Sequence, residues 1–304
     1  MNNKKNILIG SRKSNLAKEQ TSLVLRKLKR LEVGNFLVKY ILSRGDKINY
    51  ASFKLEGGKG LFTKELDNLL INGKIDLAIH SAKDIPAEIN KEITIAAFLE
   101  REDVRDVLVT NNFNIRSIFE LDDNFKFGSS SPRRINYIKN INPTVKIKNL
   151  RGNVESRIKK ITEGRLDGTL LALAGLKRLK LNYDNVNFIK VPRSIILPAP
   201  GQGAIAIMCR KNDRKIIKIC KNIEDNNTRI TVNAERAFIK EINGNCFTPL
   251  AAFARVHGKK LTIRGRLFSE DGRFFSEKKV VGDIKDSEKI GKLCAIKVLK
   301  NLNK

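Results

Sequence analysis

One short segment places an acid beside a base at a position suited to ligand chemistry. His80-Ser81-Ala82-Lys83-Asp84 follows a mostly apolar run, residues 75–79, that is typical of a buried strand. Ligands in open α/β sheets bind just past the carboxyl ends of such strands. An ionised Asp84 among cations could accept an N–H hydrogen bond and stabilise a developing positive charge. The alternative is a solvated loop with two ordinary charges.

A second segment carries a thiol in a loop. Gly244-Asn245-Cys246 lies between an expected helix, residues 230–242, and an expected strand that begins at Leu250. A loop thiol is accessible, whereas the other three cysteines lie in apolar segments and are expected in the core. These three are Cys209, Cys220 and Cys294.

The cysteines and histidines do not form a metal-binding pattern. No CxxC pair occurs, and the two histidines, His80 and His257, are far apart in the sequence. We therefore expect neither a zinc site nor a disulfide framework.

Three expected strand-to-helix turns carry cations and hydroxyl groups. A helix N-terminus offers N–H groups and partial positive charge, so that an added arginine makes an anion site. One such turn is commonly a helix cap with a surface arginine, but three favour a cleft for a ligand with several negative groups. Both carboxylates and phosphates fit such a cleft. The turns are Gly10–Ser14, Gly128–Arg134, and Arg151-Gly152-Asn153 with Arg157 one helical turn later.

Strands that alternate with helices must position these segments. The alternation runs through residues 1–99 and again through residues 100–199, which predicts two α/β domains with mainly parallel sheets. Prolines at 192, 198 and 200 mark a crossover, after which residues 203–209 form a strand that could return to the first domain. Residues 250–281 alternate like three antiparallel strands of a small α+β domain. The predicted domains are residues 1–99 with 200–217, residues 100–199, and residues 218–304.

Composition limits the classes of function. The formal net charge of the 304-residue chain is +28, but its cations are spread along the sequence and aromatic residues make up only 6%. Without a nucleic-acid-binding motif, a lysine-rich surface or a polyanionic small-molecule ligand explains this charge better than nucleic-acid binding.

No apolar run approaches the roughly 18 residues of a membrane span, and no signal peptide is present, so we expect a cytoplasmic protein. There is no P-loop, and Gly201-Gln202-Gly203 lacks the third glycine of a dinucleotide fingerprint.

Ordered motifs from residue 7 to residue 256 resemble those of the porphobilinogen deaminases, or hydroxymethylbilane synthases. The motifs are IGSRKSNLAKEQ, SRGDKI, GGKGLFTKEL, IHSAKDIP, REDVRD, GSSSPRR, LRGNVESRIKK, DGTLLALAGLKRL, LPAPGQGAIAI, AERAF and NGNC. The resemblance implies two α/β domains like periplasmic binding proteins that face a cleft, plus a C-terminal α+β domain. It also implies a transferase of porphyrin and haem biosynthesis. Such an enzyme joins four porphobilinogen molecules head to tail, releases ammonia, and forms hydroxymethylbilane.

The resemblance also assigns roles to residues by motif position. Asp84 matches the catalytic aspartate, and Cys246 matches the cysteine that holds a dipyrromethane cofactor through a thioether. Matches to cofactor-binding positions are Lys83, Ser129, Ser131, Arg133, Arg134 and Arg151. Matches to substrate-binding positions are Arg12, Ser14, Lys59, Arg157, Arg178 and Gln202. The implied protein is a monomer that needs no metal, nucleic acid or membrane.

Four positions depart from the family pattern. Asn245 replaces a glycine before Cys246, and asparagine is the least costly other residue if that position needs a positive φ. Pro132 replaces a leucine in a first helical turn, where proline fits. Leu55 stands where a lysine is usual, and Met208 stands where an acidic residue is common.

Overall fold

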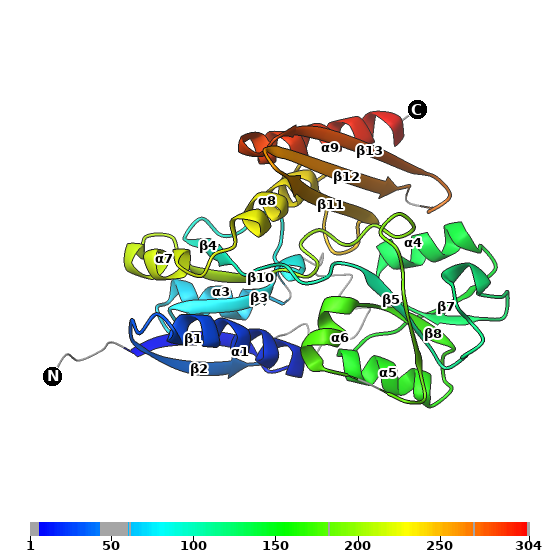
Figure 1. Ribbon diagram of the computed structural model, residues 1–304, viewed down its shortest axis with the longest axis horizontal. Coiled ribbons are helices and arrows are strands. Elements are labelled where there is room, and N and C mark those ends of the chain that lie inside the picture. Colours follow the sequence, from blue (N-terminus) through cyan, green and yellow to red (C-terminus); the bar gives the residue numbers. More distant parts are fainter. Residues whose placement is uncertain (1–5, 43–59, 61, 182, 270, 303–304) are drawn as a thin grey trace. The chain divides into compact units, whose positions relative to one another are not determined.

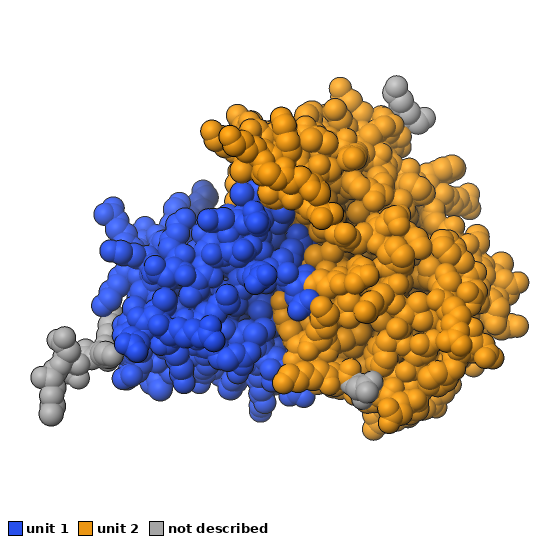
Figure 2. Space-filling view, viewed as in Figure 1, with its two compact units in different colours: residues 1–102, 203–232 blue, residues 103–202, 233–304 orange. Residues whose placement is uncertain are grey.

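A computed structural model describes residues 6–42, 60, 62–181, 183–269 and 271–302 (Figure 1). The chain groups into two compact units, each built from two separate stretches of sequence (Figure 2). The first unit comprises Met1–Glu102 and Gly203–Val232, and the second comprises Asp103–Gln202 and Asn233–Lys304. The chain therefore leaves the first unit after residue 102 and re-enters it at residue 203.

The first unit is built on a five-stranded sheet of order β2-β1-β3-β10-β4. Strand β1 is parallel to β2 and β3, whereas β10 is antiparallel to both β3 and β4. The predicted return of the chain to the first sheet is therefore confirmed, and so is the expectation of a mainly parallel sheet, because β10 runs against the other four strands, which share one direction. Strand β10 enters after the excursion through the second unit, so no helical crossover forces it to be parallel. The strands are β1 (Asn6–Arg12), β2 (Asn35–Ile41), β3 (Leu77–Ser81), β4 (Ile93–Phe98) and β10 (Ile205–Arg210).

Helices cover both faces of this sheet, because alternate strand residues point to opposite sides. Leu77 and Ile79 pack in one core cluster with residues of α1 (Asn15–Lys29) and α7 (Arg214–Lys221). Ala78 packs in another cluster with residues of α3 (Lys64–Ile71). Strand β3 is thus buried on both sides, as its apolar sequence predicts.

The second unit repeats this arrangement in a sheet of order β7-β6-β8-β5-β9. In this sheet β6 is parallel to its neighbours β7 and β8. Strand β5, which is fourth in the order, is antiparallel to its neighbours β8 and β9. The strands are β5 (Asp106–Thr110), β6 (Lys126–Gly128), β7 (Lys146–Lys148), β8 (Gly168–Ala172) and β9 (Asn187–Lys190). The helices that accompany them are α4 (Pro132–Ile141), α5 (Val154–Thr162) and α6 (Leu173–Leu179). The two sheets therefore match in order and direction, which confirms the prediction of two similar α/β sets.

A three-stranded antiparallel sheet of order β11-β12-β13 completes the second unit and confirms the prediction for the C-terminal region. The sheet shares a core with α4, because the rings of Tyr137 and Phe268 meet edge to face with centroids 4.9 Å apart. Helix α9 packs on β12 and β13. The elements are α8 (Asn226–Glu241), β11 (Leu250–His257), β12 (Lys260–Phe268), β13 (Phe275–Asp283) and α9 (Ser287–Leu302).

A fully buried carboxylate joins this third sheet to residues 197–202. These residues precede the second passage of the chain between the two units, and we call them the second crossover segment. One oxygen of Glu235 accepts a hydrogen bond from the Gly201 N–H at 2.7 Å. The other oxygen accepts from the Ala254 N–H at 2.8 Å. The bonds hold the crossover segment against β11.

Changing Glu235 to glutamine should lower the free energy of unfolding by about 1–3 kcal/mol, since the amide oxygen can accept one of the two hydrogen bonds and the NH₂ group, a donor, cannot accept the other. Urea denaturation measures this loss. Glu19→Gln, at an exposed position on α1, is the control and should change stability by no more than about 0.5 kcal/mol. Equal losses in the two variants would contradict the role of Glu235.

Candidate functional site

In the first unit, Asp84 and Arg12 meet where two adjacent strands end. Arg12 is the last residue of β1, and Asp84 closes a short 3₁₀ helix, Ala82–Asp84, that follows β3 directly. The Arg12 Nη1 atom lies 3.6 Å from the Asp84 Oδ2 atom, and the two side chains are 18% and 27% exposed. The acid is therefore accessible and lies just past a buried strand, as predicted.

An aromatic ring also supports Arg12. The guanidinium carbon lies 4.5 Å from the centroid of the Phe62 ring. In the sequence, Phe62 recurs at helical spacing with Leu66, Leu69 and Leu70, which predicts that it lies on the buried stripe of a helix, and this prediction is wrong. Helix α3 begins only at Lys64, with Thr63 at its N-cap, so Phe62 precedes the helix. Lys59, a predicted substrate-binding residue, lies outside the described residues.

Polar contacts fix the ends of β3 and α1. The Gln20 Nε2 atom donates to the Ser81 hydroxyl at 2.8 Å. Ser14, a predicted substrate-binding residue, is the N-cap of α1, and its hydroxyl oxygen accepts from the Ala17 N–H at 3.4 Å. Lys83 is exposed beside Asp84. Ser14 therefore has a structural role at the turn where the sequence predicts an anion site.

His80 lies four residues before Asp84 but is not suited to acid–base work at neutral pH. Its side chain is buried in β3, and burial, aided by the positive charge of Arg12, lowers the pKa of His80 to about 3. The imidazole is therefore neutral at pH 7.

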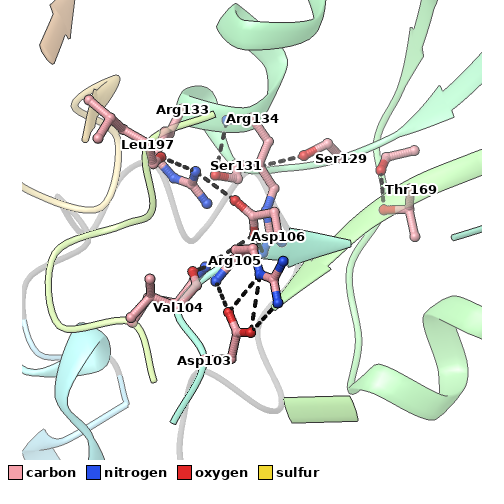
Figure 3. A network of polar contacts seen from close by, with 12 residues as sticks. Asp103, Val104, Arg105, Asp106, Ser129, Ser131, Arg133, Arg134, Thr169 and Leu197 are labelled. Atoms are coloured by element: carbon pink, nitrogen blue, oxygen red, sulfur yellow. Dashed lines mark hydrogen bonds and ion pairs between the residues drawn. The ribbon is translucent and has the colours of Figure 1, made fainter. Parts of the chain in front are cut away.

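In the second unit, two hydroxyl groups lie at the turn between β6 and α4 (Figure 3). Ser131 is the N-cap of α4, and its oxygen accepts from the Arg134 N–H at 3.5 Å. The Ser129 oxygen accepts from the Ser131 N–H at 3.1 Å. Because each hydroxyl accepts in these bonds, each keeps a proton to donate to a ligand oxygen.

Arg133 and Arg134 are buried and share one carboxylate, that of Asp106 (Figure 3). The Arg133 Nη1 atom lies 2.8 Å from Asp106 Oδ2, and the Arg134 Nη2 atom lies 2.6 Å from Oδ1. Burial alone would raise the pKa of Asp106, but the two guanidinium groups outweigh it and lower that pKa. Asp106 therefore forms two ion pairs, and it lies at the start of β5.

The remaining predicted cations of this unit lie on α5 and α6. Arg157 is in the first turn of α5, and its Nε atom donates to the Gly152 carbonyl at 2.8 Å. Arg151 precedes this helix, whose N-cap is Asn153. Arg178 lies instead in the last turn of α6. The α5 turn therefore has the form that the sequence predicts for an anion site.

Gln202, predicted to bind substrate, is fully buried in the second crossover segment. Its Nε2 atom donates to the Val104 carbonyl at 2.7 Å and lies 3.3 Å from Asp106 Oδ1. The sequence placed Gln202 and Asp106 in separate motifs, and only long-range contacts reveal that they belong to one polar network.

Cys246 is exposed, and Cys209, Cys220 and Cys294 are buried, which confirms that the loop thiol is the accessible one. Burial raises the pKa of Cys209 to about 11 and those of Cys220 and Cys294 to about 12, so these three thiols are poor nucleophiles. Asn245 shapes the loop, because its side-chain oxygen accepts from the Phe247 N–H at 2.8 Å.

Within the described parts of the chain, no group of three or more His, Cys, Asp or Glu residues could hold a metal ion. None of the described helices is long and apolar enough to cross a membrane.

Two family models match most of the chain. The family model "Porphobilinogen deaminase, dipyromethane cofactor binding domain" matches residues 7–218. The model "Porphobilinogen deaminase, C-terminal domain" matches residues 229–300. Among solved structures, the chain is similar to the periplasmic VFT2 domain of BvgS from Bordetella pertussis. That likeness has 13% identity and a TM-score of 0.46, over 77% of this chain and 91% of that one.

Curated relatives named porphobilinogen deaminase match at much higher identity. The protein from Clostridium novyi is 41% identical over 98% of this chain and 99% of its own length. The Rickettsia prowazekii protein is 45% identical over 82% of this chain and 83% of its own, and the Bacillus subtilis protein is 38% identical over 95% and 91%. The chain belongs to the porphobilinogen deaminase family.

Proposed function

We propose that this chain condenses porphobilinogen, with release of ammonia, on a dipyrromethane that is thioether-linked to Cys246. Family membership over residues 7–218 and 229–300 supports the reaction. The exposure of the Cys246 thiol supports this residue as the attachment site, because the other three cysteines are buried. When bound, the dipyrromethane would supply the pyrrole carbon to which the next pyrrole is joined.

Asp84 is the catalytic carboxylate in this proposal. Its side chain is 27% exposed at the carboxyl end of a buried strand, so it can reach a ligand while its backbone stays fixed. A carboxylate there can accept a hydrogen bond from a pyrrole N–H and stabilise the positive charge that develops as ammonia departs. Arg12, 3.6 Å away, orients the carboxylate.

The cations and hydroxyls bind the acetate and propionate groups of the pyrroles. Ser129 and Ser131 keep their hydroxyl protons for carboxylate oxygens, since both accept backbone hydrogen bonds. Guanidinium groups pair with carboxylates through two parallel hydrogen bonds, which suits a multiply anionic product chain. The arginines assigned to this role are Arg12, Arg133, Arg134, Arg151, Arg157 and Arg178, with Lys59, Lys83, Ser14 and Gln202 as further contacts.

The same proposal includes three domains and a monomeric, cytoplasmic protein. The domains are residues 1–99 with 200–217, residues 100–199, and residues 218–304. The separate sheet formed by β11, β12 and β13 supports the third of these. We assign no nucleic-acid or membrane partner.

Incubating the purified chain with porphobilinogen tests the reaction. We expect ammonia to appear as porphobilinogen disappears, one molecule for each pyrrole consumed, with heat-denatured protein as the control. Reversible binding of porphobilinogen without ammonia release would instead identify an anion-binding module of the same fold and overturn the proposal.

A further inference from the structure

We propose that Asp106 is a positioning residue, which sets the geometry of Arg133 and Arg134 for the carboxylates of bound pyrroles. This inference rests on the proposed function, because that function assigns the two arginines to the dipyrromethane. Asp106 itself is fully buried, so it has no accessible surface to offer a ligand. Its effect is exerted through the two guanidinium groups.

Two guanidinium groups divide the carboxylate of Asp106 between them (Figure 3). Arg133 takes one oxygen at 2.8 Å and Arg134 takes the other at 2.6 Å, from adjacent positions at the start of α4. The two arginine side chains are 5% and 8% exposed. Long, flexible side chains that lose this much freedom are held by specific contacts, and the shared contact is Asp106.

Asp106 is itself held from two further sides. It is the first residue of β5, and Gln202 of the second crossover segment approaches it at 3.3 Å. Arg133 also donates to the Leu197 carbonyl of the same segment at 2.7 Å, and the Leu197 N–H donates to the Tyr137 hydroxyl at 3.2 Å. The network therefore joins α4, β5 and the crossover segment, so the arginines have a fixed frame.

One carboxylate does not neutralise two guanidinium groups. The three side chains together keep one positive charge in a buried setting, which is costly unless another anion approaches. Among the described residues, the buried Nε atom of Arg134 also finds no hydrogen-bond acceptor. A ligand carboxylate supplies both the missing charge and an acceptor.

Positioning and simple charge predict opposite results when the Asp106 charge is removed. Asp106→Asn makes the site more positive, so an anionic ligand should bind more tightly if only the field matters. If Asp106 sets the geometry, the guanidinium groups lose their common anchor and the ligand should bind more weakly. The direction of the change therefore distinguishes the two explanations.

The test compares Asp106→Asn with Glu277→Gln, both in the full chain. Glu277 is a matched control because its carboxylate also bridges two arginines, Arg264 at 2.6 Å and Arg266 at 2.7 Å, on the third sheet. Intact mass gives the fraction of purified molecules that carry a pyrrole adduct, and kinetics give KM and kcat per loaded molecule. Thermal unfolding reports stability for each variant.

For Asp106→Asn we expect a smaller loaded fraction and a KM for porphobilinogen raised about 10- to 100-fold, the range for losing a charge-assisted hydrogen bond. Glu277→Gln should lose stability while its loaded fraction and KM stay within about twofold of wild type, since its arginines are assigned no ligand. A folded Asp106→Asn variant with wild-type or lower KM and full loading would overturn the inference.

A second variant decides the matter if Asp106→Asn does not fold. Asp106→Glu keeps the charge but shifts the carboxylate by one methylene, so we expect folded protein with a raised KM. Wild-type KM in Asp106→Glu, or failure of both variants to fold, would make Asp106 a structural residue only. If wild type itself carries no adduct and releases no ammonia, the proposed function fails, and this result is distinct from any difference between variants.

Discussion

Asp84→Asn should lower kcat for ammonia release by about 10³-fold, the upper end of the loss measured when one group that stabilises a transition-state charge is removed. The amide has the shape of the carboxylate but no charge to oppose a developing cation. KM should change much less, because the arginines proposed to bind the substrate carboxylates keep their side chains, and among those in the described residues Arg12 is the one that pairs with Asp84. Stability should change by less than about 1 kcal/mol, since the pair with Arg12 is 18% and 27% exposed and spans 3.6 Å.

The matched control for this prediction is Asp76→Asn. Asp76 pairs with Arg210 at 2.6 Å and precedes the amino end of β3, whereas Asp84 follows its carboxyl end. The control should lose stability and keep wild-type kcat per folded molecule. Retention of more than about a tenth of wild-type kcat by Asp84→Asn would contradict a catalytic role, because a single electrostatic group contributes at least that much.

Cys246→Ser should abolish both the covalent pyrrole adduct and the condensation. A serine hydroxyl is a far weaker nucleophile than a thiolate, so the thioether cannot be replaced by an equivalent bond. The exposed position of residue 246 means that the fold should be retained, but loss of the bound dipyrromethane should lower the temperature of thermal unfolding. Cys209→Ala, at a buried cysteine, is the control and should keep the adduct.

An adduct that persists in Cys246→Ser would place the attachment elsewhere in the chain. Full turnover by a Cys246→Ser protein without any adduct would show that condensation needs no covalent anchor. Either result would contradict the role of Cys246 as the attachment site. Neither result would bear on the role of Asp84, which has a separate test.

Local pattern predicted most of the fold. The mostly apolar run before His80 indicated a buried strand, and β3 has its first four residues buried. The prolines before residue 203 indicated a return to the first sheet, and β10 pairs there with β3 and β4. The antiparallel direction of β10 could not be predicted in this way. The direction of this strand depends on the end of the sheet at which the chain re-enters the first unit, and the local sequence does not contain that information.

The candidate site was less predictable where its contacts are long-range. Cys246 could be singled out because its loop is visible in the local sequence. The turn that holds Arg133 and Arg134 was predicted as an anion site, but the local sequence did not reveal that both side chains are buried against Asp106, which is 28 positions before Arg134. Nothing in a local window pairs residues at such a separation. Phe62 was misassigned because a hydrophobic period does not reveal the residue at which a helix begins.

The most direct test of the whole account is the mass of the wild-type chain, followed by peptide mapping. We predict a mass that exceeds the sequence by two pyrrole units, with the excess on the peptide that contains Cys246. Ehrlich's aldehyde should stain the same peptide. A chain of bare sequence mass that still releases ammonia from porphobilinogen, or an adduct mapped to another residue, would contradict it.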